Sequence, residues 1–161
     1  MNNVVVTFEL ERLSPALESD WWNKDEFVVF SGHLPPPVLK APYRQNFYSF
    51  FIAEAGIMEI EVDVVKYTVQ KNDLLFNNPS HVAQVYSISP DMAGKVIAFK
   101  KEFLDGELFN PTDKLSFINS TPFLRLDEKE AALVSGLIEE MKVKLTDSQR
   151  PNRRQVAINL I

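Results

Sequence analysis

The feature that most constrains the fold is a stretch of alternating apolar and polar residues within positions 42–99. Between Ile57 and Asp63, the apolar residues Met58, Ile60 and Val62 alternate with acidic residues. A period of two is typical of a β-strand with one buried and one solvated face. Several such runs follow one another with short polar breaks, which predicts an antiparallel meander or a small barrel.

The breaks between the runs set the expected strand limits. Gly56 and the turn Lys71-Asn72-Asp73 separate neighbouring runs, and Ser31-Gly32 is expected to end an early strand. The three prolines at 35–37 predict an extended connection with apolar flanks that pack on the barrel. Residues 14–24 show no clear period and are expected to be irregular. The predicted strands cover residues 4–10, 27–30, 46–53, 57–63, 66–70, 74–76, 81–88 and 95–99.

The pattern becomes helical after residue 99. Asp127 and Glu130 have the spacing of a capping box, and Leu126 can contact Ala131 as a hydrophobic staple, so we expect a helix to begin at Asp127. The final residues carry no helix stop signal, and we expect the natural chain to continue beyond them. We also expect a short helix over 101–104, a loop-rich connection over 109–123 and a last helix over 153–161.

Composition excludes several classes of protein. The 161 residues carry a formal net charge of −5, so this chain lacks the positive charge with which proteins bind DNA or RNA phosphates. It contains no cysteine, which excludes disulfides, thiol catalysis and thiolate metal sites and agrees with a cytoplasmic location. The N-terminus lacks the features of a signal peptide, and no apolar run reaches the roughly 18 residues of a membrane span.

Five short motifs occur in an order known from one family. Residues 8–13 read FELERL, 43–48 YRQNFY, 71–76 KNDLLF, 78–82 NPSHV and 99–104 FKKEFL. In order and spacing they resemble the N-terminal effector-binding and dimerisation domain of AraC/XylS-type transcription regulators. The resemblance covers residues 5–161.

The resemblance implies a mainly β fold: a cupin-like (double-stranded β-helix or jelly-roll) barrel followed by C-terminal α-helices. It implies a sensor barrel with an N-terminal arm over residues 1–105 and a helical dimerisation and linker segment over 106–161. It also implies a bacterial cytoplasmic regulator that is a homodimer, binds a small effector, has no membrane partner and is not an enzyme. Contact with DNA would come only from a helix-turn-helix domain after residue 161.

Metal-binding cupins place two His and a Glu on the strand that begins here at Tyr43, and a third His on a later strand. This chain has Tyr43, Gln45, Ser49 and Ala83 at those positions. None of the four is a good ligand for a first-row metal. We therefore expect no metal, no cofactor and no catalytic residue. The alternative, a small metal-dependent cupin enzyme such as an isomerase or dioxygenase, is disfavoured by the missing histidines.

The predicted strand after Pro42 carries the candidate ligand-binding residues. Tyr43, Gln45, Phe47 and Ser49 share parity and therefore one face, which combines aromatic walls with hydroxyl and amide groups. Such a face suits a small effector such as a sugar or an organic acid. By the parity of its own strand, His81 faces inward, as an effector contact or as a satisfied polar residue at the barrel mouth. The aromatic residues could equally well fill the barrel, and the barrel could serve assembly alone.

An apolar stripe marks one side of the predicted helix that begins at Asp127. It either docks on the barrel of its own chain or pairs with the same helix of a second subunit. We favour the dimer contact, with Leu137 and Met141 at its centre. The stripe consists of Val134, Leu137, Ile138, Met141 and Leu145.

Overall fold

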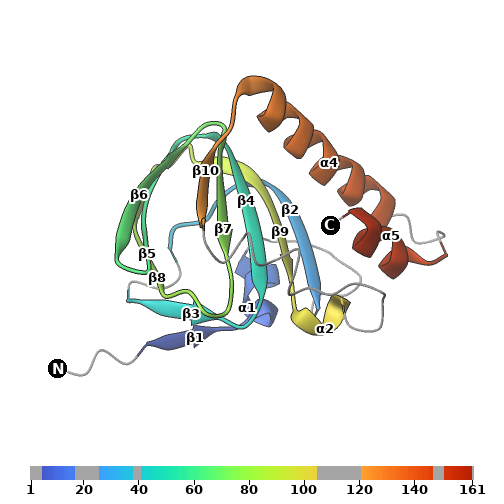
Figure 1. Ribbon diagram of the computed structural model, residues 1–161, viewed down its shortest axis with the longest axis horizontal. Helices are drawn as coiled ribbons and strands as arrows, with labels where there is room; N and C mark the ends of the chain where they lie inside the picture. Colours follow the sequence, from blue (N-terminus) through green and yellow to red (C-terminus); the bar gives the residue numbers. More distant parts are fainter. Residues whose placement is uncertain (1–4, 17–25, 38–40, 105–120, 147–150, 161) are drawn as a thin grey trace.

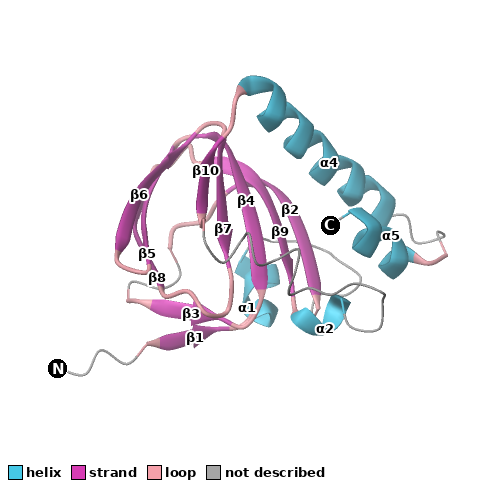
Figure 2. Cartoon of the chain, in the orientation of Figure 1, coloured by secondary structure: helices cyan, strands magenta, loops and turns pink. Residues whose placement is uncertain are grey.

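Two five-stranded β-sheets face one another, and two C-terminal helices cover the outer side of one of them (Figures 1 and 2). The computed structural model describes residues 5–16, 26–37, 41–104, 121–146 and 151–160. Sheet A consists of β1 (Val6–Phe8), β3 (Tyr43–Gln45), β8 (Ala83–Ile88), β5 (Ile57–Val62) and β6 (Val65–Gln70), in that spatial order. Sheet B consists of β10 (Phe123–Arg125), β7 (Asp73–Asn77), β4 (Tyr48–Ala55), β9 (Ala93–Phe99) and β2 (Phe27–His33). The helices are α1 (Leu10–Ala16), α2 (Lys101–Leu104), α4 (Glu128–Thr146) and α5 (Arg153–Leu160).

The chain moves back and forth between the two sheets. Among the described strands, only β5 and β6 are neighbours both in sequence and within a sheet. The simple meander is therefore wrong, and the jelly-roll form of the barrel prediction describes the arrangement better. Period-two patterns reveal strands but not their partners, which is why the sequence left the topology open.

The alternation in β5 is confirmed. Met58, Ile60 and Val62 are buried, whereas Glu59 and Glu61 lie on the outer face of sheet A. Burial of every second residue places the apolar side chains of this strand between the two sheets.

The predicted strand over residues 46–53 is interrupted at its start. β3 ends at Gln45 in sheet A, and β4 begins at Tyr48 in sheet B. Asn46 fixes the crossing, because its backbone N–H donates to Phe8 O (3.1 Å) and its Oδ1 accepts from Leu10 N (3.0 Å).

Three other segments differ from expectation. β2 continues through Gly32 to His33 and pairs with β9 along its whole length, so Ser31-Gly32 does not end it. Residues Leu10–Ala16 form α1, and Phe123–Arg125 form an edge strand of sheet B, where no such elements were predicted. Of the segments expected to be irregular, residues 17–24 and 109–120 lie outside the described residues, as does the predicted domain boundary at residue 105.

An ion pair joins β10 to its neighbour β7. Asp73, which is fully buried, accepts from Arg125 Nε (3.0 Å) and from the backbone N–H of Gln70 (2.9 Å). A carboxylate is tolerated at this depth because charged and backbone donors surround it.

Sheet B separates two apolar cores. The inner core lies between the sheets and includes Phe8, Val28, Phe47, Phe51, Met58, Ile60, Val62, Leu75, Val96 and Ala98. The outer core lies between sheet B and the helices and includes Phe27, Val29, Ile52, Ile97, Phe99, Phe103, Ala131, Ile138, Met141, Leu145, Ala157 and Ile158. Successive residues of β4 and β9 thus belong to opposite cores.

The predicted helix after Asp127 is confirmed, including its capping box. Asp127 Oδ1 accepts from Glu130 N (2.9 Å), and Glu130 Oε2 accepts from Asp127 N (2.9 Å). Within the described residues, no helix is long and apolar enough to cross a membrane.

The apolar stripe on α4 does not form one free surface. Ile138, Met141 and Leu145 are at most 3% exposed and pack on sheet B, and Val134 is partly buried against the same core. Leu137 is 42% exposed. A dimer contact with Met141 at its centre therefore needs correction, because in this arrangement the chain's own sheet covers that side chain.

Candidate functional site

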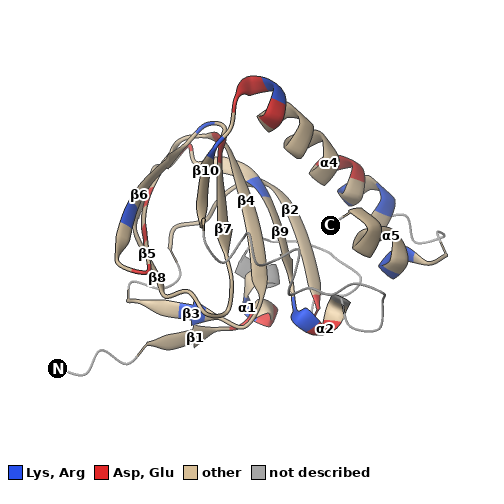
Figure 3. Cartoon of the chain, viewed as in Figure 1, with Lys and Arg blue, Asp and Glu red and all other residues tan. Residues whose placement is uncertain are grey.

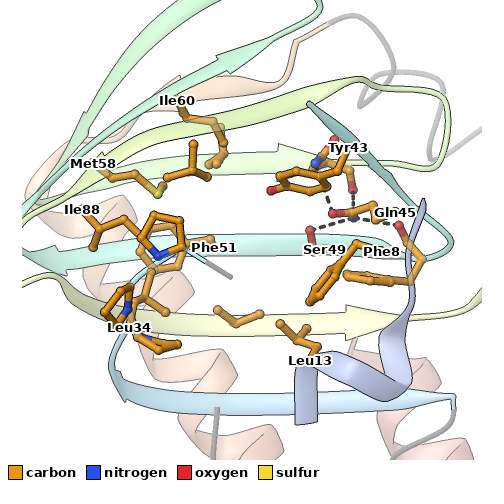
Figure 4. A pocket seen from close by; sticks show the side chains of 18 residues that line it. Phe8, Leu13, Leu34, Tyr43, Gln45, Ser49, Phe51, Met58, Ile60 and Ile88 are labelled. Atoms are coloured by element: carbon orange, nitrogen blue, oxygen red, sulfur yellow. Dashed lines mark hydrogen bonds between the residues drawn. The ribbon is translucent and has the colours of Figure 1, made fainter. Parts of the chain in front are cut away.

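A cavity of about 190 Å³ lies between the two sheets (Figure 4). Its walls come from β3, β4, β5, β7, β8 and β9, with additional contacts from the N-terminal segment and from the proline run. The barrel is hollow at this point rather than filled by its aromatic side chains. The lining residues are Phe8, Leu13, Leu34, Pro35, Pro36, Pro37, Tyr43, Gln45, Phe47, Ser49, Phe51, Met58, Ile60, Leu75, Asn77, Val85, Ile88 and Val96.

Four of the predicted ligand-binding residues line this cavity: Tyr43, Gln45, Phe47 and Ser49. They do not belong to one strand, because Tyr43 and Gln45 lie in sheet A and Ser49 lies in sheet B. The crossing between the sheets brings them together, since each sheet turns this part of its inner face toward the cavity.

His81 is not among the residues that line the cavity, contrary to its predicted inward position on a strand. It precedes β8, is 4% exposed, and its Nε2 lies 3.1 Å from Asn78 Nδ2 and 3.8 Å from Asp63 Oδ2. Asn78 Oδ1 accepts from the backbone N–H of Ser80 (2.8 Å), which fixes the amide with its nitrogen toward the ring. The other ring nitrogen, Nδ1, is buried and has no hydrogen-bond partner among the described residues.

Gln45 links the two sheets at one end of the cavity. Its Nε2, which carries two hydrogens, lies within hydrogen-bond distance of three acceptors, Phe47 O (2.7 Å), Ser49 Oγ (3.0 Å) and Asn77 O (3.2 Å). Its Oε1 accepts from Asn77 Nδ2 (3.1 Å). The side chain is 5% exposed. Because its polar atoms are already engaged, Gln45 positions the wall of the cavity and offers little to a ligand.

Unlike the amide of Gln45, the hydroxyl of Tyr43 is available to a ligand. Its hydroxyl points along the cavity toward the end formed by Met58 and Ile88 (Figure 4), and it makes no hydrogen bond to the described residues. The ring contacts Phe8 edge-on, with centroids 6.1 Å apart. Loss of solvation raises the pKa of Tyr43 to about 12, so the phenol stays neutral.

The cavity has one polar and one apolar end. Gln45 and Ser49 lie at the first, and Leu34, Phe51 and Met58 lie at the second (Figure 4). In the part of the chain that the structure describes, no Lys, Arg, His, Asp or Glu lines the cavity. Figure 3 shows charged residues on turns, on helices and on several strands, and of those in the described part of the chain Asp73 is fully buried in its ion pair with Arg125.

A glycine determines where Phe51 lies. A Cβ at Gly94 would collide with the backbone oxygen of Ile52 and with the ring of Phe51. The absence of a side chain lets the ring lie directly over the backbone of β9. A larger residue at position 94 would therefore force β4 and β9 apart as well as displace the Phe51 ring.

The donor set of the cavity does not fit a metal ion. Tyr43, Gln45 and Ser49 offer a neutral phenol, an engaged amide and a hydroxyl, while Ala83 pairs with Tyr43 in sheet A and has no donor atom. Within the described part of the chain, no group of three or more His, Cys, Asp or Glu side chains could hold an ion. Carboxylate, imidazole or thiolate ligands, which first-row metals prefer, are missing from the cavity wall.

Sequence reasoning missed the contribution of the proline run. Leu34 and Pro35 to Pro37 line the cavity, and Leu34 N donates to Met92 O (2.9 Å). The apolar flanks of the run predicted that it would pack on the barrel, and they were the only sequence feature that pointed toward its place in the cavity wall. Nothing in the pattern indicated that its partner would be a cavity.

No protein-family model and no curated protein matches this chain. Similar solved structures include the AraC-like transcriptional activator CuxR, with a TM-score of 0.49 and 13% identity over 71% of this chain and 40% of that chain. ToxT from Vibrio cholerae has a TM-score of 0.43 and 11% sequence identity, over 84% of this chain and 53% of that chain. KdgF from Halomonas sp. has a TM-score of 0.39 and 11% sequence identity, over 53% of this chain and 92% of that chain. The chain thus spans about half or less of the two regulators that it matches. The described residues themselves form two facing sheets around a cavity, followed by helices, which confirms the mainly β fold with C-terminal helices that the sequence predicted.

Proposed function

We propose that this chain is the ligand-sensing and dimerisation part of a transcription regulator, in which a small molecule in the cavity changes how α4 sits on sheet B. One observation carries the proposal: β4 and β9 line the cavity with one face and hold α4 with the other. Phe51 and Val96 line the cavity, while their neighbours Ile52 and Ile97 pack in the outer core with α4. A ligand that displaces the two cavity-lining residues also displaces their two neighbours in the outer core, because adjacent residues of a strand share one rigid backbone.

Polar contacts add to this coupling. Lys95, the residue before Val96 on β9, lies 3.4 Å from Glu139 Oε2 and donates to Ser135 O (3.2 Å), both on α4. The Lys95 side chain is 13% exposed, so solvent screens these contacts less than it would at the surface. A ligand can exert control only to the extent that it favours one arrangement of sheet and helix over another.

The outer face of α4 is the proposed dimer contact. Leu133, Leu137 and Val143 are 66%, 42% and 63% exposed there, and a Cβ added at Gly136 would meet no atom within 4 Å. In an antiparallel pair of helices centred between positions 134 and 135, Leu133 lies across from Gly136 of the second copy. The same pairing places Lys129 across from Glu140 twice, so the surface is complementary to itself in charge and in shape.

The dimer is tested with Leu137→Glu, which places a charge at the centre of this contact. Light scattering is expected to report a dimer for the unaltered chain and a monomer for the variant. Val65→Glu is the control, because Val65 is similarly exposed (49%) but lies in sheet A. An unaltered chain that is monomeric, or a Leu137→Glu protein that remains dimeric, would contradict the proposed contact.

Ligand sensing is tested by a thermal-shift screen over sugars, organic acids and neutral aromatic compounds. A ligand at 100 times its dissociation constant adds about 2.7 kcal/mol of stability, which for a chain of this size raises Tm by roughly 5–11 °C. If no compound of any class shifts Tm, the chain is better described as an assembly module. For the regulator as a whole, the proposal places a DNA-binding module after residue 161, and a reporter gene under its control should respond to the same compound.

A further inference from the structure

The wall of the cavity restricts the charge of what can bind. None of the described residues that line it carries a charge, and they belong to the inner faces of two facing sheets and to the segments beside them. A carboxylate inside would lose its hydration without gaining a cationic partner, and an ion buried in that way is strongly disfavoured. This argues against the organic acids that the sequence alone left open.

The wall also restricts the number of polar groups on a ligand. The amides of Gln45 and Asn77 bond to each other, and Gln45 Nε2 also donates to Ser49 Oγ. The hydroxyls of Tyr43 and Ser49 remain the main donors for a guest. A sugar brings several hydroxyls, most of which would be left without partners, at a cost of about 1–3 kcal/mol for each buried group.

The size of the cavity sets a third limit. An engineered apolar cavity of about 150 Å³ binds benzene, and this one measures about 190 Å³. The cavity extends from the Tyr43 hydroxyl to an apolar end at Phe51, Met58 and Ile88 (Figure 4).

Building on the proposed sensing function, we propose that the cavity takes a small, neutral, mainly apolar molecule of about the size of one aromatic ring. The molecule carries a single hydrogen-bonding group that meets Tyr43, while its apolar body lies against Phe51 and Met58. Because burial raises the pKa of the Tyr43 phenol to about 12, ionisation of this group adds no pH dependence to binding between pH 6 and 9.

The test uses three aromatic probes, benzyl alcohol, toluene without its hydroxyl and the charged benzoate, together with glucose as a polyhydroxylated probe. Calorimetric titration of the 161-residue chain is expected to show binding of benzyl alcohol and of toluene, about tenfold weaker for toluene, which lacks the hydroxyl. Toluene should compete with benzyl alcohol. Benzoate should bind at least about 100-fold more weakly than benzyl alcohol, and glucose should not bind.

Tyr43→Phe is the matched variant, because it removes only the hydroxyl. It should weaken the binding of benzyl alcohol by roughly three- to tenfold and leave the binding of toluene unchanged. An equal effect on both probes, or none on benzyl alcohol, would overturn the role given to Tyr43.

The outcomes separate this inference from the proposed function. If benzoate or glucose binds and the neutral aromatic probes do not, the ligand class is wrong but the chain is still a sensor. If none of the four probes binds at millimolar concentration, the ligand class is refuted, and the broader thermal-shift screen then decides separately whether the chain is a sensor.

Discussion

The packing of α4 gives a prediction that distinguishes its two faces. Met141 is 1% exposed and lies among the residues of the outer core, so truncation to alanine leaves a hole that its neighbours cannot close. Substitution of a buried Met by Ala costs about 2–5 kcal/mol, which is a large share of the roughly 5–15 kcal/mol that stabilises a typical domain. For a central value of about 3 kcal/mol, Tm falls by roughly 6–12 °C.

The control is Leu137→Ala on the same helix, four positions away. Leu137 is 42% exposed, and this substitution is expected to change stability by no more than about 1 kcal/mol. Both variants preserve helix propensity, because Ala is the most favourable helix residue. The difference between them therefore measures burial.

Urea unfolding followed by circular dichroism provides the assay. Met141→Ala should lower the urea midpoint with no change in the slope m, whereas Leu137→Ala should barely move it. The proteins should be compared at two concentrations, because dimerisation adds stability that depends on concentration. If Leu137→Ala were the more destabilising variant at both concentrations, α4 would face sheet B with its other side.

Three further predictions concern the N-terminal cap of α4, the hydrogen bonds of Gln45 and the phenol of Tyr43. Asp127→Ala removes the acceptor for Glu130 N and should cost about 0.5–2 kcal/mol in urea unfolding. Gln45→Leu leaves Asn77 Nδ2 without Gln45 Oε1 as its acceptor and should cost about 1–3 kcal/mol or more. Tyr43 has a folded pKa of about 12, above the ordinary 10, so the stability that it contributes is complete below pH 10 and is lost as pH rises toward 12. Absorbance titration of the unaltered chain and of Tyr43→Phe should differ by one phenol that ionises late.

Each of these has a result that would contradict it. A cap variant as stable as the parent would mean that the N-terminus of α4 is held by its packing alone. A Gln45→Leu protein of parental stability would mean that the sheets need no polar link at this end of the cavity. Loss of an early rather than a late phenol in Tyr43→Phe would show that the hydroxyl is solvated.

Local features of the chain could be predicted from the sequence. The alternation around Met58 and the capping box at Asp127 each depend on residues a few positions apart, and the structure has both as expected. The one-sided pattern of β5 survives because a register slip would expose the whole apolar face. Turns rich in Asn, Asp and Pro were placed for a similar local reason.

Features that depend on distant residues could not be predicted. Nothing near Gln45 indicates that the chain changes sheets there, because the acceptors and donors that hold the crossing belong to Leu10, Phe8 and Asn77. The stripe on α4 was recognised, but a hydrophobic stripe does not reveal what covers it. Apolar periodicity marks a buried face whether the partner is the chain's own sheet or a second copy.

The cavity shows why a ligand site was harder to predict than a core. Phe47 and Phe51 look alike in sequence, and both lie in the inner core, yet what leaves space beside Phe51 is the absence of a side chain at Gly94 on another strand. That glycine lets the ring lie against β9, and β9 carries Lys95 and Ile97 beneath α4 on its other face. Gly94, which makes room for the Phe51 ring, is therefore part of the strand through which a ligand would act on the helix. Gly94→Ala should for this reason reduce ligand binding and disturb α4 together, whereas Tyr43→Phe should affect binding alone.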